Sequence, residues 1–275
     1  MPLHRRLMAI LALGAAFAGP AQAANFDLYG AAPAELAPIQ PDSDFIVILG
    51  LGVGTAAAYE GASDYTMTFK PIIKVEKLQW GWIDIDGEKR PGGFKFSPSA
   101  GYEGERRSED HAALTGLDDV GATYALGARI GYEFVFDDML SAEIYGAARH
   151  VFGGARGWVG EAGVDITAKL TPELEIIGGP VVNFASEGYM DTYFGVTPAE
   201  SAASGGRLEA FDPSGGVKSV GVKLEARYEF VPDTFVSLNA SYSSYVGDIS
   251  QSPVVKAGSE QQFTVGLGLA RRFSF

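Results

Sequence analysis

The 275-residue sequence contains no cysteine and only three histidines. A chain without thiols forms no disulfide framework and no thiolate metal site. His4 lies in a leader segment and His111 in a loop, and His150 falls at the end of a strand on its outward face. No Gly-x-Ser-x-Gly nucleophile motif is present. The sequence therefore predicts a protein that is not an enzyme, with no catalytic residue, no metal site and no cofactor.

Basic residues are also in short supply. The chain has 21 Lys and Arg against 34 Asp and Glu, which gives a formal net charge of −13 at pH 7. An acidic chain is repelled by phosphate backbones and by anionic surfaces. We therefore expect no nucleic acid partner.

Long apolar runs are missing too, apart from one near the N-terminus. A positively charged start, His4 to Arg6, is followed by an apolar stretch from Leu7 to Phe17 and by Ala21-Gln22-Ala23. This order is that of a secretory signal peptide, and its apolar part is too short to span a bilayer. We expect residues 1–23 to be removed. Two arginines and no acidic residue are then lost, so the formal charge changes from −13 to −15.

Residues 24–43 are rich in alanine and proline, with Pro33, Pro38 and Pro41 among them. Proline removes backbone donors and restricts the residue before it. A periplasmic arm or a plug within a lumen is therefore expected here, and not a strand. The main domain is then expected to span residues 44–275.

The stretch from Gln262 to Phe275 shows the pattern of that domain most clearly. Phe263, Val265, Leu267 and Leu269 alternate with small or polar residues, and the stretch ends on Phe273 and Phe275. A period of two describes a strand that faces two different environments. An apolar face that ends in aromatics is typical of the last strand of an outer-membrane β-barrel, which closes against the first strand. Phe273 and Phe275 are therefore the predicted closure residues.

The same alternation recurs along the rest of the chain. Such runs are longer than the roughly 5–6 residues of a strand in a soluble β-sandwich and close to the roughly 9–11 that a tilted strand needs to cross a bilayer. Aromatic residues also gather at the strand ends, as in interfacial girdles. We therefore predict an all-β fold, a transmembrane antiparallel up-and-down β-barrel in the outer membrane of a Gram-negative bacterium, surrounded by membrane lipid. The predicted strands are Phe45–Val53, Tyr65–Val75, Phe94–Glu103, Val120–Phe134, Leu140–Ala148, Trp158–Leu170, Leu174–Phe184, Val220–Phe230, Val236–Ser243 and the closing strand.

The number of strands depends on two segments. Leu78 to Asp86 either extends the strand before it or forms a strand of its own, and its Trp80 and Trp82 suit an interfacial girdle. Gly188 to Gly216 is either a long loop or contains another strand. Short turns belong on the periplasmic side and long loops outside. This rule favours about 10 strands, with 12 as the alternative.

The predicted strand Val220–Phe230 carries four charges on one face. Lys223, Glu225, Arg227 and Glu229 alternate with apolar residues, and lipid excludes charges from the outer face of a barrel. The four side chains are therefore predicted to point into the lumen, where Arg129 and Glu161 from other strands are predicted to meet them. Charges that alternate in sign favour a salt-bridged plug over a conduction path of a single sign.

Three segments resemble the MipA/OmpV family of MltA-interacting outer-membrane proteins. They are Gly50 to Tyr65, Asp191 to Gly205, and Gly247 to Val255 together with the closing Arg272-Phe273. The third segment carries one acidic residue fewer than the family tends to have. The resemblance implies an outer-membrane scaffold that joins a murein transglycosylase to a penicillin-binding synthase. Other members are described as adhesins or as osmotically regulated proteins.

The functions that remain open are a scaffold for peptidoglycan-remodelling enzymes, a small-solute pore that prefers cations in view of the acidic chain, and an adhesin. The residues of the second and third segments are candidates either for partner contact or for a loop folded into the lumen. These motif residues are Asp191, Thr192, Tyr193, Phe194, Gly195, Gly247, Asp248, Ser252 and Pro253.

Overall fold

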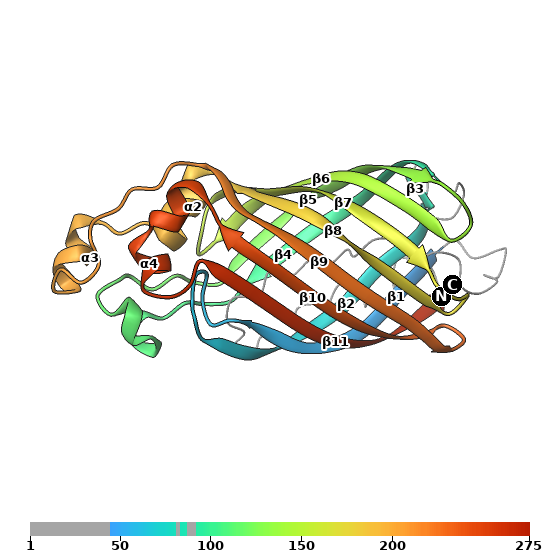
Figure 1. Ribbon diagram of the computed structural model, residues 1–275, viewed down its shortest axis with the longest axis horizontal. Coiled ribbons are helices and arrows are strands. Elements are labelled where there is room, and N and C mark those ends of the chain that lie inside the picture. Colours follow the sequence, from blue (N-terminus) through green and yellow to red (C-terminus); the bar gives the residue numbers. More distant parts are fainter. Residues whose placement is uncertain (1–44, 81–82, 87–91) are drawn as a thin grey trace.

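The computed structural model describes residues 45–80, 83–86 and 92–275. The predicted leader (1–23) and arm (24–43) lie outside the described residues, as do the side chains of Trp80 and Trp82. The described chain forms one antiparallel sheet that curls around an interior (Figure 1). Its strands are β1 (Phe45–Ala57), β2 (Tyr65–Trp80), β3 (Ile83–Asp86), β4 (Gly93–Glu103), β5 (Thr123–Val135), β6 (Leu140–Gly153), β7 (Gly157–Lys169), β8 (Leu174–Ala185), β9 (Gly216–Val231), β10 (Thr234–Tyr245) and β11 (Gln261–Ser274).

The strand order confirms the predicted up-and-down barrel of about ten strands. Of the 11 strands in the sheet, β3 has 4 residues, and the other ten have between 11 and 16. Strands adjacent in sequence pair from β4 to β11, and β11 then pairs with β1. The ambiguous segment Leu78–Asp86 divides between two strands, because β3 folds back and pairs with Lys77–Trp80 of β2.

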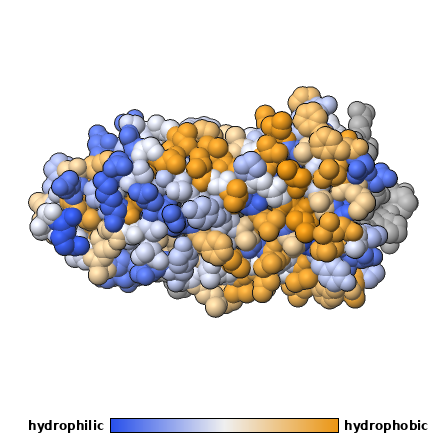
Figure 2. All heavy atoms as spheres, in the orientation of Figure 1, coloured by the Kyte–Doolittle hydropathy of each residue, from blue (hydrophilic) through white to orange (hydrophobic). Residues whose placement is uncertain are grey.

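The outer wall is apolar, as a lipid-facing surface requires. On β5 the exposed residues Tyr124, Ile130 and Phe134 alternate with inward residues such as the buried Arg129. Tyr124 and Phe134 lie roughly 34 Å apart along the strand, or about 26 Å in height at a tilt of ~40°, which matches the apolar band of a membrane barrel. Figure 2 shows hydrophobic residues gathered over much of the barrel wall, while the end that bears the helices is hydrophilic.

The two ends of the barrel differ in their connections. Tight turns join β5 to β6, β7 to β8 and β9 to β10 at the end where β11 finishes. In the first of these turns the Asp137 carboxylate accepts hydrogen bonds from the backbone N–H groups of Met139 and Leu140, both at 2.8 Å. We call this the turn end. Asp137, Pro172 and Pro232 lie in these three turns.

The opposite end, which we call the loop end, carries the long connections. These contain α2 (Glu187–Phe194), α3 (Pro198–Ala203), α4 (Pro253–Lys256) and three short 3-10 helices. Gly188–Gly216 is therefore a long connection, mostly helix and loop, that leads into β9. Val120, predicted as the start of a strand, forms an isolated bridge with Arg106, and β5 begins at Thr123. No helix in the described ranges is long and apolar enough to cross a membrane.

Candidate functional site

The connections at the loop end pack into a folded cap with a hydrophobic core. Most of its members come from the connections between β1 and β2, β4 and β5, β8 and β9, and β10 and β11, and the rest from the β6–β7 connection and the ends of strands. Met190 and Phe194 of α2 are fully buried in it, and the Phe194 ring packs edge-on against Tyr245 of β10 with ring centroids 5.2 Å apart. Leu114 and Val254 are fully buried from other connections. The cap therefore packs at one mouth of the barrel, and its hydrophobic core includes the ends of several strands.

The two motif segments singled out in the sequence meet inside this cap. The Ser252 hydroxyl donates to the backbone carbonyl of Phe194 at 2.6 Å, and the Tyr193 hydroxyl donates to Thr123 Oγ1 at 2.7 Å. Tyr193, Phe194 and Ser252 are buried inside the cap. The remaining motif residues sit around this contact: Asp191 and Thr192 on α2, Gly195 at its end, Gly247 and Asp248 in a 3-10 helix, and Pro253 at the start of α4.

Arg106 ties the β4–β5 connection to the end of α2. Its guanidinium, which is buried, donates to the backbone carbonyls of Tyr193 at 3.0 Å and Asp118 at 3.4 Å. A second hydrogen bond links the β4–β5 connection to α3, because the Glu200 carboxylate accepts from the backbone N–H of Asp118 at 2.9 Å. Sequence reasoning missed both residues, since their partners are backbone atoms brought close only by the fold.

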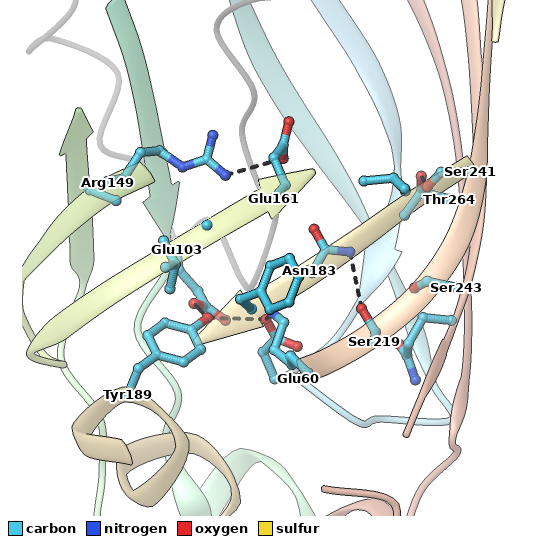
Figure 3. Close-up of a pocket in the computed structure, with 18 of the residues that line it drawn as sticks. Glu60, Glu103, Arg149, Glu161, Asn183, Tyr189, Ser219, Ser241, Ser243 and Thr264 are labelled. Carbon is cyan, nitrogen blue, oxygen red and sulfur yellow. Dashed lines mark hydrogen bonds and ion pairs between the residues drawn. The ribbon is translucent and has the colours of Figure 1, made fainter. Parts of the chain in front are cut away.

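On the barrel side of α2, two buried carboxylates share one tyrosine hydroxyl (Figure 3). The Tyr189 hydroxyl lies 2.7 Å from a Glu103 oxygen and 3.1 Å from a Glu60 oxygen. Glu60 also forms an ion pair with Lys218 at 2.7 Å and accepts a hydrogen bond from Tyr245. Five different elements thus meet at one polar cluster. None of these residues was predicted, because the sequence separates Glu60 from Lys218 by 158 positions.

The neighbours of Glu60 in this cluster favour its ionised form. Burial alone would raise the pKa of the Glu60 carboxyl, but the Lys218 ammonium and the hydroxyls of Tyr245 and Tyr189 outweigh burial and hold that pKa below its usual 4.5. Burial, followed by the nearby Glu103 and Glu60 carboxylates, raises the pKa of Tyr189 well above 10. Tyr189 therefore stays a hydrogen-bond donor, which anchors α2 to the barrel wall.

A cavity of about 250 Å³ extends from this cluster into the barrel. One side carries paired charges, such as Arg149 with Glu161 at 3.2 Å. The other side carries hydroxyl groups, among them Ser241 and Thr264, whose oxygens are 2.6 Å apart. Figure 3 shows both pairs across the same space. We call this space the cap-side cavity.

Further down, a network of charges spans β5, β6, β7 and β9. Arg129 pairs with Asp165 at 2.8 Å and with Glu143 at 3.1 Å, and Lys223 pairs with the same Asp165 at 3.2 Å. The Arg129 guanidinium also lies 3.5 Å from the centre of the Tyr145 ring. All these residues point inward, so the network projects into the lumen from the wall between β5 and β9.

The other predicted lumen charges lie nearer the turn end. Arg227 pairs with Glu225 at 3.2 Å and with the fully buried Glu175 at 3.5 Å. The Glu229 carboxylate accepts from the backbone N–H of Asp233 at 2.6 Å, so it supports a turn. Arg129 and Glu161 therefore lie in the lumen with the β9 charges, yet their own ion pairs are made within β5–β7.

A second cavity, of about 300 Å³, lies on the turn side of the network. We call it the turn-side cavity. Ile48, Phe235 and Ala270 form a small apolar cluster there, with Ile72 packed against it. The charged side chains of Lys74, Asp165, Lys223, Glu225 and Arg227 also line it. Among the described residues no group of three or more His, Cys, Asp or Glu side chains is placed to hold a metal ion.

The closing strand completes the wall. Phe45 and Phe275 exchange backbone hydrogen bonds of 3.2 and 2.9 Å, and their rings stack with centroids 6.0 Å apart. Phe273 and Phe275 are both exposed on the outside. Arg272 turns inward and pairs with Glu76 of β2 at 2.8 Å, so an ion pair across β1 accompanies closure.

Long tilted strands, an apolar outer band, a polar interior and one capped mouth define an outer-membrane β-barrel. The comparisons with known proteins agree with this class. A family model described as MltA-interacting protein MipA matches residues 49–273, and the chain belongs to this family. The protein is thus an outer membrane protein of the MipA family.

Relatives and solved structures are similar at a greater distance. "Putative outer membrane protein YiaT" of Escherichia coli strain K12 is 25% identical over 243 residues, which cover 82% of this chain and 91% of the relative. An outer membrane channel from Pseudomonas putida F1 is 12% identical, with a TM-score of 0.49 over 89% of this chain and 100% of that one. The outer membrane channel DcaP of Acinetobacter baumannii is 10% identical, with a TM-score of 0.36 over 86% and 100%.

Proposed function

We propose that this protein is a non-enzymatic outer-membrane scaffold for peptidoglycan-remodelling enzymes, a murein transglycosylase and a penicillin-binding synthase. The observation that carries the proposal is the cap, whose core around Met190 and Phe194 packs at the loop end of the barrel. A barrel built to conduct solutes keeps an aqueous lumen, whereas paired charges project into this lumen from the wall between β5 and β9. The description of the family, MltA-interacting, supports the class of partner.

Peptidoglycan lies in the periplasm, so the partner surface should be at the turn end. Short turns face the periplasm in barrels of this kind. The exposed parts of these turns include Asp137, Asp138 and Glu173. The predicted arm, residues 24–43, would enter on the same side. The motif residues in the cap would then help to close the loop end of the barrel, and the partner would bind at the turn end.

The test is capture of the partner from cross-linked cell envelopes, followed by direct binding of the purified proteins. We expect a murein transglycosylase to be recovered with the full mature chain, and less of it with an Asp137→Lys/Asp138→Lys variant. A matched control is the Glu105→Lys/Glu109→Lys variant, in which the charges are reversed at the loop end and capture should be unchanged. Recovery of no peptidoglycan enzyme, with the barrel correctly inserted, would refute the scaffold.

A small-solute pore is the second candidate, and the two cavities favour it. Lys223, Ser241 and Thr264 line both of them, so the spaces adjoin along the wall of β9, β10 and β11. Conduction through this path would require the cap to move. Single-channel recording in planar bilayers separates the candidates, since a steady ohmic conductance from the intact protein supports the pore.

A further inference from the structure

The charges that line the cap-side cavity are balanced, with one exception. Six charged side chains line this cavity, and five of them have a partner of opposite charge within 3.2 Å. The pairs are Glu60 with Lys218 at 2.7 Å, Glu161 with Arg149 at 3.2 Å, and Lys223 with Asp165 at 3.2 Å. Glu103 lines the cavity as well, but it forms no ion pair with any described residue. When Glu103 is ionised, the cavity therefore holds one negative charge that its lining does not balance.

The cations around Glu103 are engaged with other groups. Glu103 is 5% exposed, and one of its carboxylate oxygens accepts from the Tyr189 hydroxyl at 2.7 Å. Lys218 pairs with Glu60, and Arg106 donates to a backbone carbonyl of α2 at 3.0 Å. The titratable groups that face Glu103 are Glu60, Arg106, Tyr189, Tyr193, Lys218 and Tyr245. Neither of the two cations among them forms an ion pair with Glu103.

The position of Glu103 makes its negative charge costly. Glu103 lies opposite Thr123 in the ladder, one residue beyond Tyr124 toward the loop end, so it is outside the apolar band of the barrel. Burial, followed by the nearby Glu60 carboxylate, raises the pKa of Glu103 to about 8. A buried carboxyl in this position is compensated either by a proton or by a cation that comes from outside the protein. The cavity beside it provides room for such a cation.

Another side of the cavity offers uncharged hydrogen-bonding groups. Figure 3 shows Ser219 and Ser243 across the space from Glu103. The Asn183 amide donates to Ser219 Oγ at 3.0 Å, and the Ser219 hydroxyl keeps its own hydrogen for another acceptor. The Ser243 hydroxyl forms no hydrogen bond within the described chain. These two serines can therefore bind the hydroxyl groups of a small molecule.

From this arrangement we propose that the cap-side cavity binds a small hydroxylated organic cation, with its ammonium group on the Glu103 carboxylate and its hydroxyl groups toward Ser219 and Ser243. An anion would add to the unbalanced charge, and a neutral molecule would leave it in place. Hydrogen bonds between an ammonium and a carboxylate are roughly twice as strong as neutral ones. A volume of about 250 Å³ restricts the ligand to a compact molecule. Its approach is from the turn-side cavity, which adjoins along β9, β10 and β11.

Titration calorimetry with a matched pair of probes tests the proposal. The cationic probe is 3-aminopropane-1,2-diol and the neutral probe is glycerol, which differ only in one ammonium group that replaces one hydroxyl. Each is titrated into the full mature chain, folded in detergent micelles. We expect the cationic probe to bind at least tenfold more tightly than glycerol at pH 7.5, because only the ammonium compensates the Glu103 carboxylate.

Protons supply a second measurement on the natural chain. Below its raised pKa Glu103 carries a proton, which the ammonium must displace. Lowering the pH from 7 to 6 should therefore weaken binding about tenfold, since the ionised fraction of Glu103 falls by about that factor. The probe itself stays charged, because alkyl ammonium groups titrate well above this range. At pH 7 binding should release nearly one proton per ligand, which is measured from the heats in buffers of different ionisation enthalpy.

Glu103→Gln keeps an oxygen for the Tyr189 hydroxyl but removes the charge, so the preference for the cationic probe and its pH dependence should both be lost. Glu105→Gln is the matched control, because Glu105 is exposed and does not line the cavity. The heat-dependent gel shift checks the folding of each variant. The proposal is overturned if the natural chain binds the cationic probe no more tightly than glycerol, if binding releases no proton, or if Glu103→Gln binds the cationic probe as tightly as the natural chain. None of these outcomes depends on whether the protein binds peptidoglycan enzymes.

Discussion

The lumen network makes Arg129 the residue whose loss should cost the barrel most. Its guanidinium is buried and serves two buried carboxylates, Asp165 at 2.8 Å and Glu143 at 3.1 Å. Asp165 keeps Lys223 as a second cation at 3.2 Å. Glu143 would be left with no cation in the described part of the network. Removing one partner of a buried ion pair typically costs about 3–5 kcal/mol, because the other charge stays buried without compensation. We expect Arg129→Met to lower the free energy of unfolding by about this amount.

The double variant Arg129→Met/Glu143→Met separates pairing from packing. Replacing a buried ion pair by apolar residues of similar size is often neutral, or stabilising by about 1–4 kcal/mol. The double variant should therefore recover most of the stability that Arg129→Met loses. Arg107→Met is the matched control, because Arg107 pairs with Glu105 at 3.0 Å while both side chains are about half exposed. An exposed pair contributes only about 0–1 kcal/mol.

Urea unfolding of the protein in lipid vesicles, followed by the gel shift of the folded barrel, measures these differences. Two outcomes would refute the reasoning. One is an Arg129→Met variant that loses no more stability than Arg107→Met. The other is a double variant that is less stable than Arg129→Met alone, which would mean that the pair matters through shape and not through uncompensated charge.

Other predictions follow from the wall, the closing strand and the cap. Leu224→Arg places a charge on the lipid face and should cost about 2–4 kcal/mol in the unfolding assay, whereas Leu224→Ile should change little. Phe275→Asp should lower the amount of barrel in outer-membrane fractions, and normal levels would exclude a role in closure. Deleting residues 188–216 should raise conductance in planar bilayers if that segment closes the barrel. The Glu60–Lys218 pair should lose its stabilising effect as the pH falls below 4.5 through the lowered pKa of Glu60, a loss that hydrogen exchange of α2 should show in the natural chain and not in Glu60→Gln.

The strands could be predicted because the pattern that defines each of them lies within a short stretch of sequence. Alternation between apolar and polar residues reports the two faces of each strand, so ranges such as Leu174–Phe184 came within one residue of the observed bounds. The segment Leu78–Asp86 was harder. Its division between β2 and β3 depends on a short pairing that adds only four residues.

The cap could not be predicted in the same way. Tyr189, Met190, Tyr193 and Phe194 do recur at a spacing of four, which is a helical signal, but the helix has only eight residues. Its stability comes from contacts with distant segments, such as the bond from Ser252 to the Phe194 carbonyl. The same holds for the shared hydroxyl of Tyr189, because Glu60 lies in the β1–β2 connection and Glu103 is the last residue of β4. One sequence shows which residues are apolar, but not which loops meet.

The charges inside the barrel also act as a check on strand alignment. On the outer face of β8 and β9, a shift of two residues in the register still places apolar side chains beside apolar side chains. Contact with lipid therefore does not favour the correct register over the shifted one. Inside, Glu175 lies directly opposite Arg227. The same slip would place Glu175 opposite Glu225 or Glu229, and the barrel would bury two like charges side by side. The charges inside the lumen thus destabilise a shifted register that contact with the membrane alone would not disfavour.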